Sequence, residues 1–512
     1  MSHVVLPATV NLRLSLRGIA KLGGNWSRSV LWATLCIIVA AGAWLRFHNL
    51  GADSLWLDEA ISWQQSKDSL PDLISRTAKD NYPPLHNLFL HASINLFGDG
   101  EWSLRLPSVI FGTANILAIY WLGSMTGGWI TGLLAAAFLA LSGFHVMYSQ
   151  EARMYALLSL TATLFAASSF YFVRSPTIPR AALVSLAGLT LLYSHPFGTL
   201  DWIAIVTAIS LFTLRAPVNV RRTIAVWVAS NVVAAVAFAP WAWLLLRRAA
   251  AINRGRSTDF SWIPYPSPEV VYSALTGMVG GRFMAAVLFV GVVLALLPAR
   301  YAVSAEKPRL TKNPIPVFFV WAGLPIALAL LTSLVSTPIF LSRYLIGSLP
   351  ALLLAGTYGL SRLVTSWAGF GVMGILSVAT LTTSYVRYTT APREDVSMVP
   401  REDWRGVSAM LEERLRPSDC VLFYQPYMMV VLRYYYRKQL PCQLLPTSGA
   451  NLEVQNIAGD RLFVVLSHAS PAETDQILET LRSNHWSTRQ EFHFQDVLTV
   501  ELGSDSSARG SP

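Results

Sequence analysis

The sequence predicts a polytopic α-helical membrane protein that carries a small C-terminal α/β domain. Hydrophobic residues make up 53% of the 512 residues and charged residues only 13%, about half the charged share of an ordinary soluble protein. Long apolar stretches recur from residue 30 to residue 388, whereas the segment after residue 392 alternates charged helical stretches with short strand-like ones. Most of the chain therefore belongs in lipid, with a polar domain at its C-terminal end.

The apolar stretches predict about eleven membrane spans, because about 17 to 24 apolar residues cross the roughly 30 Å of hydrocarbon in a bilayer. They begin near Val30, Leu106, Trp129, Ala152, Ala181, Thr199, Thr223, Phe283, Pro314, Leu345 and Ala368. The first stretch, Val30 to Phe47, is long and lacks a small-residue cleavage site. We therefore expect an anchored first span and not a removed signal peptide.

The basic residues predict the orientation of these spans. Short loops on one side hold arginine or lysine, as cytoplasmic loops do. With a cytoplasmic N-terminus, the longer loops and everything after Tyr388 fall on the periplasmic side of a bacterial inner membrane. The expected parts are a cytoplasmic tail (1–29), a transmembrane domain (30–388) with outer loops 48–105 and 247–282, a periplasmic α/β domain (389–503) and a disordered tail (504–512).

The C-terminal domain is predicted from alternating helical and strand-like patterns. The expected helices are Arg401 to Leu415 and Pro471 to Arg482, and the expected strands are Val421 to Tyr424, Leu462 to Leu466 and Val497 to Leu502.

The formal net charge of +10 does not indicate nucleic acid as a partner. The arginines stand singly or in pairs between apolar runs, with no basic tract interleaved with aromatic residues. Cytoplasmic loops and sites that bind lipid phosphates explain the excess better.

The first outer loop contains an acidic pair in an apolar setting. Helical spacing across Gly51 to Gln65 places Trp56 and Trp63 on one face and Asp58 on another. This pattern predicts an interfacial helix with Asp58 toward a cavity, where it can act as a general base. The alternative is a solvated acidic pair. Two more helices are expected, one from Ser69 that ends before Tyr82 and one from Leu85 to Phe97.

Six short motifs occur in order along the chain. They are Leu55-Trp56-Leu57-Asp58-Glu59, Tyr82-Pro83-Pro84-Leu85-His86, Arg105-Leu106-Pro107-Ser108, Tyr148-Ser149-Gln150-Glu151-Ala152-Arg153-Met154-Tyr155, Tyr193-Ser194-His195-Pro196 and Ser342-Arg343-Tyr344-Leu345. Together they resemble the GT-C glycosyltransferases of the protein O-mannosyltransferase and lipid A aminoarabinose or galacturonic acid transferase type, over roughly residues 30–388.

The resemblance implies the GT-C fold, a polyprenyl-phosphate sugar as donor, and inverting transfer without a nucleotide. It gives Asp58 the role of catalytic base and Glu59 a supporting role. One position departs from the pattern: relatives that act on lipid A often carry a basic residue before the Pro-Pro pair, and this chain has Tyr82. That departure puts lipid A in doubt as the acceptor.

A departing polyprenyl phosphate needs fixed positive partners, and the planar guanidinium of arginine suits phosphate oxygens. The candidates for donor-phosphate binding are Arg105, Arg153, Arg254, Arg256, Arg343 and the hydroxyl of Tyr344. The alternative for any one arginine is a side chain that reaches to the lipid headgroups.

Tyr82, His86 and His195 are candidates for the substrate pocket. His195 stands at the outer end of a span and can hold a sugar hydroxyl or assist proton movement, although a packing histidine is equally compatible. His86 and His91 are five residues apart and therefore lie on different sides of a helix, so a metal pair is not expected. No cofactor is required. A divalent ion at Asp58 and Glu59 is possible but not expected.

Cys420 and Cys442 flank the first two strand-like segments of the outer domain. In an oxidising compartment these two residues are a candidate disulfide, and the alternative is two buried free thiols.

Two other classes of protein remain open. A transporter or flippase would carry ionisable residues near the bilayer midplane and often repeated halves, neither of which is visible here. A non-catalytic scaffold would not need Asp58 or Arg153. The sugar is not defined by the sequence, nor is the acceptor, which can be a glycolipid, a polysaccharide precursor or a protein.

Overall fold

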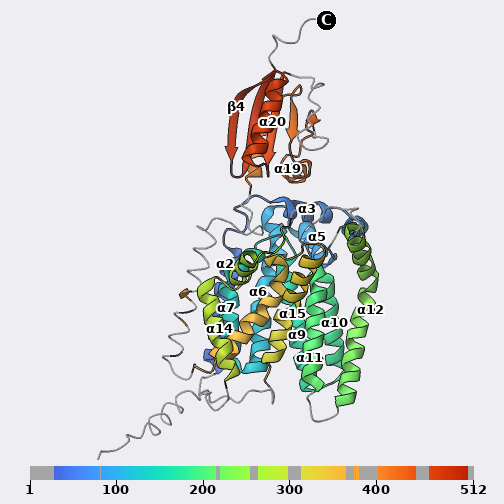
Figure 1. The fold of residues 1–512 in the computed structure, drawn as a ribbon, viewed down its shortest axis with the longest axis vertical. Helices are drawn as coiled ribbons and strands as arrows, with labels where there is room; N and C mark the ends of the chain where they lie inside the picture. The colour runs from blue at the N-terminus through green and yellow to red at the C-terminus, as the bar shows by residue number, and fades with distance from the viewer. Residues whose placement is uncertain are drawn as a thin grey trace, which may run out of the picture. The chain divides into compact units, whose positions relative to one another are not determined.

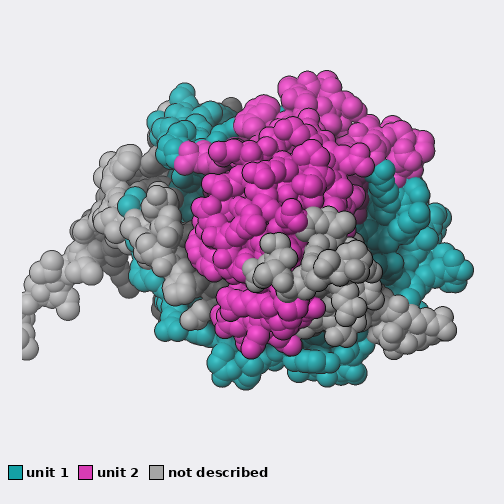
Figure 2. Space-filling view, turned by 90° about the horizontal axis from the view of Figure 1, so that it is seen from above, with its two compact units in different colours: residues 1–48, 74–86, 106–397 teal, residues 49–73, 87–105, 398–512 magenta. Residues whose placement is uncertain are grey.

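The computed structural model describes residues 28–80, 82–214, 220–253, 263–297, 313–364, 402–444 and 460–504, with five single positions between 369 and 379. The chain forms two compact units (Figure 2). Unit 1 comprises residues 1–48, 74–86 and 106–397, and unit 2 comprises residues 49–73, 87–105 and 398–512.

Apolar helices make up unit 1 and run side by side as a bundle (Figure 1). They are α2 (Arg28–Phe47), α6 (Glu101–Gly127), α7 (Trp129–Leu141), α8 (Gly143–Ser149), α9 (Tyr155–Arg174), α10 (Ile178–Ser194), α11 (Pro196–Leu214), α12 (Val220–Asn253), α13 (Pro268–Met278), α14 (Arg282–Leu296), α15 (Ile315–Val335), the 3-10 helix η2 (Ser342–Ser348) and α16 (Leu349–Leu360). Within the described residues, six helices are long and apolar enough to cross a membrane, or eight if the bent pairs α7–α8 and α13–α14 each form one span.

These helices match the predicted spans in position. Each predicted start from Val30 to Pro314 falls within a few residues of the first residue of a helix. The predicted span near Leu345 begins as the 3-10 helix η2 and continues as α16. The structure describes only five positions of the predicted span from Ala368, between 369 and 379, and the tails 1–27 and 505–512 lie outside the described residues. The protein is therefore a multi-span membrane protein, as predicted.

A fully buried arginine fixes the bend between α7 and α8. The Arg46 guanidinium donates to the carbonyls of Leu139 and Ala140 at 3.1 Å each, and so satisfies the open C-terminal end of α7. The amide of Gln150 in turn donates to the carbonyl of His48 at 2.8 Å. These bonds hold the segment that leads to Arg153.

Unit 2 contains a five-stranded sheet with the strand order β2-β1-β3-β5-β4. The strands are β1 (Cys420–Phe423), β2 (Gln443–Leu444), β3 (Arg461–Ser467), β4 (Trp486–Phe494) and β5 (Val497–Ser504). β1 is parallel to β2 and β3, and β5 is antiparallel to β3 and β4. The remaining elements of the C-terminal segment are α18 (Trp404–Arg414), η3 (Pro426–Met428), α19 (Met429–Tyr435) and α20 (Pro471–Ser483).

Side chains alternate between the two faces of this sheet, as the strand repeat requires. Leu422 and Val464 face α20, which lies across one face in Figure 1. Val421 and Val465 face α18 and α19 on the other side. The sheet is thus buried between two helical layers, which confirms the small α/β domain.

The outer loop contributes three helices, α3 (Leu57–Ser66), α4 (Leu70–Ala78) and α5 (Leu85–Phe97). All three were expected, and the α5 bounds agree with the prediction. The predicted boundaries differ from the structure in one respect: residues 49–73 and 87–105 group with the C-terminal domain and not with the helical bundle. The physical reason is that Ala60 of α3 is buried in the same apolar cluster as Trp404 and Leu432.

Candidate active site

The acidic pair lies in the first turn of α3, where the helix dipole favours negative charge. The two carboxylates have different surroundings. Glu59 is 0% exposed, whereas Asp58 is half-buried. Asp58 is therefore the one of the two that an external molecule can reach.

Arg105 binds Glu59 through two parallel hydrogen bonds. Its Nε donates to Oε1 at 2.9 Å and one terminal nitrogen donates to Oε2 at 2.8 Å. Both side chains are 0% exposed. A buried carboxylate of this kind depends on its cation, because an uncompensated charge in the interior is costly.

The other donors of Arg105 go to backbone carbonyls, namely those of Leu50, Asp53 and Ser54, at 2.8, 3.0 and 3.1 Å. Guanidinium has five N–H donors, and all five are accounted for by Glu59 and these carbonyls. Arg105 consequently has no N–H left for a phosphate. Arg105 therefore has a structural role and not the predicted role in donor-phosphate binding. It holds residues 50–54 and Glu59 in place.

A second group of candidate residues forms a cluster of rings within unit 1. The hydroxyls of Tyr82 and Tyr344 lie 3.2 Å apart. The His195 ring lies 5.5 Å from the Tyr82 ring and 5.2 Å from the Tyr344 ring, between centroids. Tyr155 and Phe197 complete the group, with ring centroids 6.4 and 5.2 Å from that of Tyr344. The motifs around residues 82, 155, 195 and 344 therefore meet in space.

Two buried arginines border this ring cluster. Arg153 and Arg343 are each 3% exposed. The guanidinium carbon of Arg153 lies 4.8 Å from the Tyr82 ring centroid, and that of Arg343 lies 5.5 Å from the Tyr344 ring centroid. Each arginine is thus held by an aromatic face as well as by its chain position. Two positive charges at an aromatic cluster can attract an anionic ligand.

His195 presents a defined hydrogen-bond donor in this cluster. The backbone N–H of Phe197 donates to His195 Nδ1 at 3.0 Å. In the neutral ring, Nε2 must then carry the proton. Nε2 is buried and has no hydrogen-bond partner among the described residues. A buried donor without an acceptor is costly in free energy. An oxygen atom of a ligand would supply the missing acceptor for the His195 Nε2–H.

His86 is buried in the same unit but cannot act as a base near neutral pH. Burial, together with the positive charge of Arg153, lowers the pKa of His86 to about 3. Its ring lies 3.5 Å from the Ser108 hydroxyl, which donates to the backbone carbonyl of Arg153 at 3.0 Å. His86 is a neutral neighbour of the segment that carries Arg153.

Sequence reasoning missed Asp201, which is 2% exposed in α11. Its carboxylate lies where a Cβ atom on Gly347 would have to sit, so the glycine lets η2 approach α11 closely. Within the described part of the chain, one carboxylate oxygen of Asp201 has no hydrogen-bond partner. A single aspartate inside an apolar stretch is the signal that would have drawn attention to it.

The remaining candidates are two arginines and two cysteines. Arg254 and Arg256 lie outside the described residues. Cys420 and Cys442 form a disulfide, with Cα atoms 4.5 Å apart. Within the ranges that the structure describes, three or more His, Cys, Asp or Glu side chains do not come together as metal ligands.

The fold and these residues define a class of protein: a multi-span membrane protein with a buried arginine and tyrosine cluster and a small α/β domain. Residues 81–244 match the family described as dolichyl-phosphate-mannose-protein mannosyltransferase. A search of curated protein sequences finds no match.

Solved structures share the fold. ArnT from Cupriavidus metallidurans in the apo state is 16% identical with a TM-score of 0.59, over 95% of this chain and 100% of that chain. The same protein bound to undecaprenyl phosphate gives 16% identity and a TM-score of 0.57, over 93% and 99%. The oligosaccharyltransferase AglB from Archaeoglobus fulgidus, in complex with an inhibitory peptide and a dolichol-phosphate, is 10% identical with a TM-score of 0.51. This match covers 95% of this chain and 75% of that chain. The resemblance seen in the motifs is confirmed: the chain has the fold of the GT-C glycosyltransferases.

Proposed function

We propose that this protein is a glycosyltransferase that moves a sugar from a polyprenyl-phosphate donor to an acceptor on the outer face of the bacterial inner membrane. The observation that carries the proposal is the cluster of Arg153, Arg343, Tyr82, Tyr344 and His195. Its two cations and the His195 Nε2–H can bind phosphate oxygens away from water. Undecaprenyl phosphate and dolichol-phosphate, bound to two proteins of this fold, are ligands of the same chemical class.

The reaction we propose is a direct displacement at the anomeric carbon. An acceptor hydroxyl oxygen forms a bond to this carbon, and the bond from the carbon to the phosphate oxygen breaks. The polyprenyl phosphate leaves with the electron pair, and Arg153 and Arg343 stabilise its negative charge. Asp58 accepts the hydroxyl proton. One displacement inverts the configuration of the sugar.

Asp58 is the better base of the acidic pair. It is half-buried in the first turn of α3, whereas both carboxylate oxygens of Glu59 accept from Arg105. With arginines to neutralise the leaving group, the reaction needs no divalent metal. The periplasmic position of the C-terminal domain is part of the same proposal.

The direct test is mass spectrometry of lipids and envelope glycans from a deletion strain. We expect one glycan, lipid or protein to lose one sugar residue and the undecaprenyl-phosphate form of that sugar to accumulate. This result would also identify the sugar and the acceptor. If envelope and lipids keep every sugar, the proposal fails.

A reconstituted assay supplies rates. The purified chain in nanodiscs receives undecaprenyl phosphate that carries mannose, galacturonic acid or aminoarabinose, together with lipid extract from the deletion strain. Release of undecaprenyl phosphate reports transfer. A transporter or flippase would leave the donor intact, and a scaffold would be unaffected by Asp58→Asn.

A further inference from the structure

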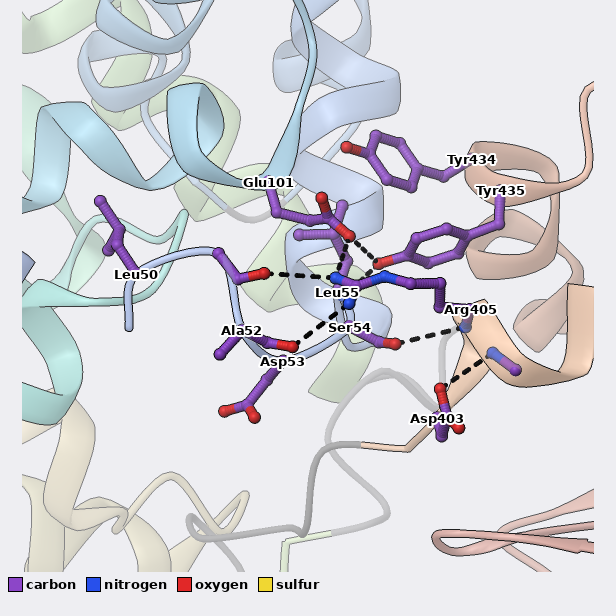
Figure 3. Close-up of polar contacts among 12 residues, drawn as sticks. Leu50, Ala52, Asp53, Ser54, Leu55, Glu101, Asp403, Arg405, Tyr434 and Tyr435 are labelled. Carbon is purple, nitrogen blue, oxygen red and sulfur yellow. Dashed lines mark hydrogen bonds and ion pairs between the residues drawn. The ribbon is translucent and has the colours of Figure 1, made fainter. Parts of the chain in front are cut away.

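Five consecutive backbone carbonyls just before the acidic pair accept hydrogen bonds from two arginines. Arg105 binds the carbonyls of Leu50, Asp53 and Ser54. Arg405 of α18 binds the two between them, those of Gly51 and Ala52, at 3.3 Å each. Figure 3 shows this stretch together with the side of the C-terminal domain that binds it. A stretch outside any helix or strand is thus held along its whole length.

Tyr435 of α19 binds the next residue along the chain, Leu55, just before α3 begins. The Leu55 amide donates to the Tyr435 hydroxyl at 2.6 Å, and this hydroxyl donates to Glu101 at 3.0 Å. Arg405 donates to the same Glu101 oxygen at 2.7 Å, and its backbone amide donates to the Ser54 hydroxyl at 3.2 Å. Residues nearly 400 positions apart in the sequence therefore share one hydrogen-bond network (Figure 3).

The tyrosine keeps its proton in this setting. Burial, with a contribution from Glu101, raises the pKa of Tyr435 well above its ordinary value. The hydroxyl can therefore accept from Leu55 and donate to Glu101 at the same time.

The start of α3 lacks a side-chain cap. Its N-cap residue, Trp56, makes no side-chain capping bond, although such bonds usually fix where a helix begins. Leu55 is 0% exposed, and Ala60 packs in the apolar cluster of the C-terminal domain. The position of Asp58 in the first turn therefore depends on contacts with the C-terminal domain as well as on the pair of Arg105 with Glu59.

We infer that Arg405 and Tyr435 are positioning residues for Asp58, so that the C-terminal domain holds the catalytic loop in its working geometry. This inference rests on the proposed function, because it assigns the domain a part in that reaction. A catalytic group that is displaced by about 1 Å can lose about 100-fold in rate. In this assignment Arg405 and Tyr435 act through residues 51–55 and not by binding the donor or the acceptor.

The adjacent tyrosine provides a matched control. The Tyr434 hydroxyl donates to the Asp99 carbonyl at 2.6 Å, and this acceptor lies outside the stretch of residues 50–55. Tyr434→Phe and Tyr435→Phe each remove one hydroxyl and keep the ring. Arg437, which pairs with Asp99 at 3.1 Å, is the corresponding control for Arg405→Ala.

The first measurement is hydrogen exchange of the full chain in nanodiscs, with no ligand. We expect Tyr435→Phe to speed exchange of amides in residues 50–60 by about tenfold or more, because the Leu55 amide loses its acceptor and the helix entry loosens. Exchange in β3 should stay unchanged, and Tyr434→Phe should leave residues 50–60 as in wild type. Equal exchange in the two variants would overturn the inference.

The second measurement separates positioning from binding. With the undecaprenyl-phosphate sugar that wild type consumes, Tyr435→Phe should lower kcat about tenfold or more and leave KM for the donor within about twofold. A raised KM with unchanged kcat, or a Tyr435→Phe rate equal to that of Tyr434→Phe, would contradict positioning.

Failure of the two ideas can be told apart. If Asp58→Asn transfers sugar at the wild-type rate, the proposed base is wrong, whatever the exchange data show. If Asp58→Asn is inactive while Tyr435→Phe behaves like Tyr434→Phe in both measurements, the proposed function stands and the positioning role is wrong.

Discussion

Arg105 and Glu59 form a fully buried, doubly hydrogen-bonded ion pair across 46 positions of sequence, with N to O distances of 2.9 and 2.8 Å. The pair joins the first turn of α3 to the start of α6 and leaves neither charge exposed. Glu59, beside the candidate base, is thereby a structural partner in the site.

Removal of Arg105 should destabilise the protein strongly. Arg105→Ala leaves the buried Glu59 carboxylate without its cation, which costs about 3 to 5 kcal/mol. Thermal unfolding in detergent should show a clearly lower midpoint. Arg437→Ala is the control: the two side chains of its pair with Asp99 are 68% and 34% exposed, and exposed pairs contribute little. An unchanged midpoint for Arg105→Ala would refute the structural role.

Asp58→Asn should abolish transfer while the thermal midpoint stays near that of wild type. A general base contributes about 10² to 10⁴-fold in rate, and the half-buried Asp58 carboxylate is replaced by an amide of the same shape. Transfer assays in nanodiscs measure the rate. Activity above about a tenth of wild type would exclude Asp58 as the base.

Arg153→Ala and Arg343→Ala should weaken use of the donor more than use of the acceptor. Each variant loses a buried charge that we assign to the leaving phosphate, and kcat/KM for the donor should fall about 100-fold. Arg180→Ala is a matched control, since Arg180 also stacks on a tyrosine, with 3.8 Å from its guanidinium carbon to the Tyr171 ring centroid. If all three variants use the donor alike, the phosphate site lies elsewhere.

The C-terminal domain should be more stable in mild acid than in base. His468 lies 2.7 Å from the buried Glu402 carboxylate, and this hydrogen bond raises the pKa of His468 in the folded protein. Its contribution is therefore fully present below the unfolded pKa of about 6.5 and is lost as pH rises through the higher folded pKa. Thermal midpoints at about pH 6 and pH 9 should differ less in His468→Gln than in wild type. His493→Gln, at an exposed histidine beside Glu491, should keep the wild-type difference.

The disulfide between Cys420 and Cys442 should stabilise the C-terminal domain by about 3 kcal/mol, because it closes a loop in the unfolded chain. Cys420→Ser with Cys442→Ser should lower its unfolding midpoint accordingly. Intact-mass analysis after alkylation without reductant tests the bond itself. Two labels on these cysteines in folded protein taken from cells would contradict it, whereas labels that appear only after reduction would support a periplasmic domain.

Much of the architecture follows from the sequence. Apolar stretches identify the helices because lipid requires every backbone polar group to be satisfied within a segment. The strands β1, β3 and β5 were predicted because both faces of the sheet are covered, which requires apolar runs. β4 was missed because most of its residues are exposed and polar, and the short helix α19 lacks a pattern long enough to recognise.

The site was predicted in part, for a physical reason. Motifs identify residue types that chemistry needs, so Arg153, Arg343, Tyr344 and His195 could be named. The hydrogen-bond partners of a side chain depend on three-dimensional geometry. The sequence therefore could not show that Arg105 binds Glu59. Tyr435 was missed for the same reason: its contact with Leu55 spans 380 positions and leaves no local pattern.

The most direct test of the central claim is the reconstituted reaction with an undecaprenyl-phosphate sugar, followed by mass spectrometry and by NMR of the product. We predict that wild type releases one undecaprenyl phosphate for each sugar transferred, that the anomeric configuration of the sugar is inverted, and that Asp58→Asn forms no product. Donor that remains intact with every sugar in the panel, or a product with retained configuration, would contradict the account.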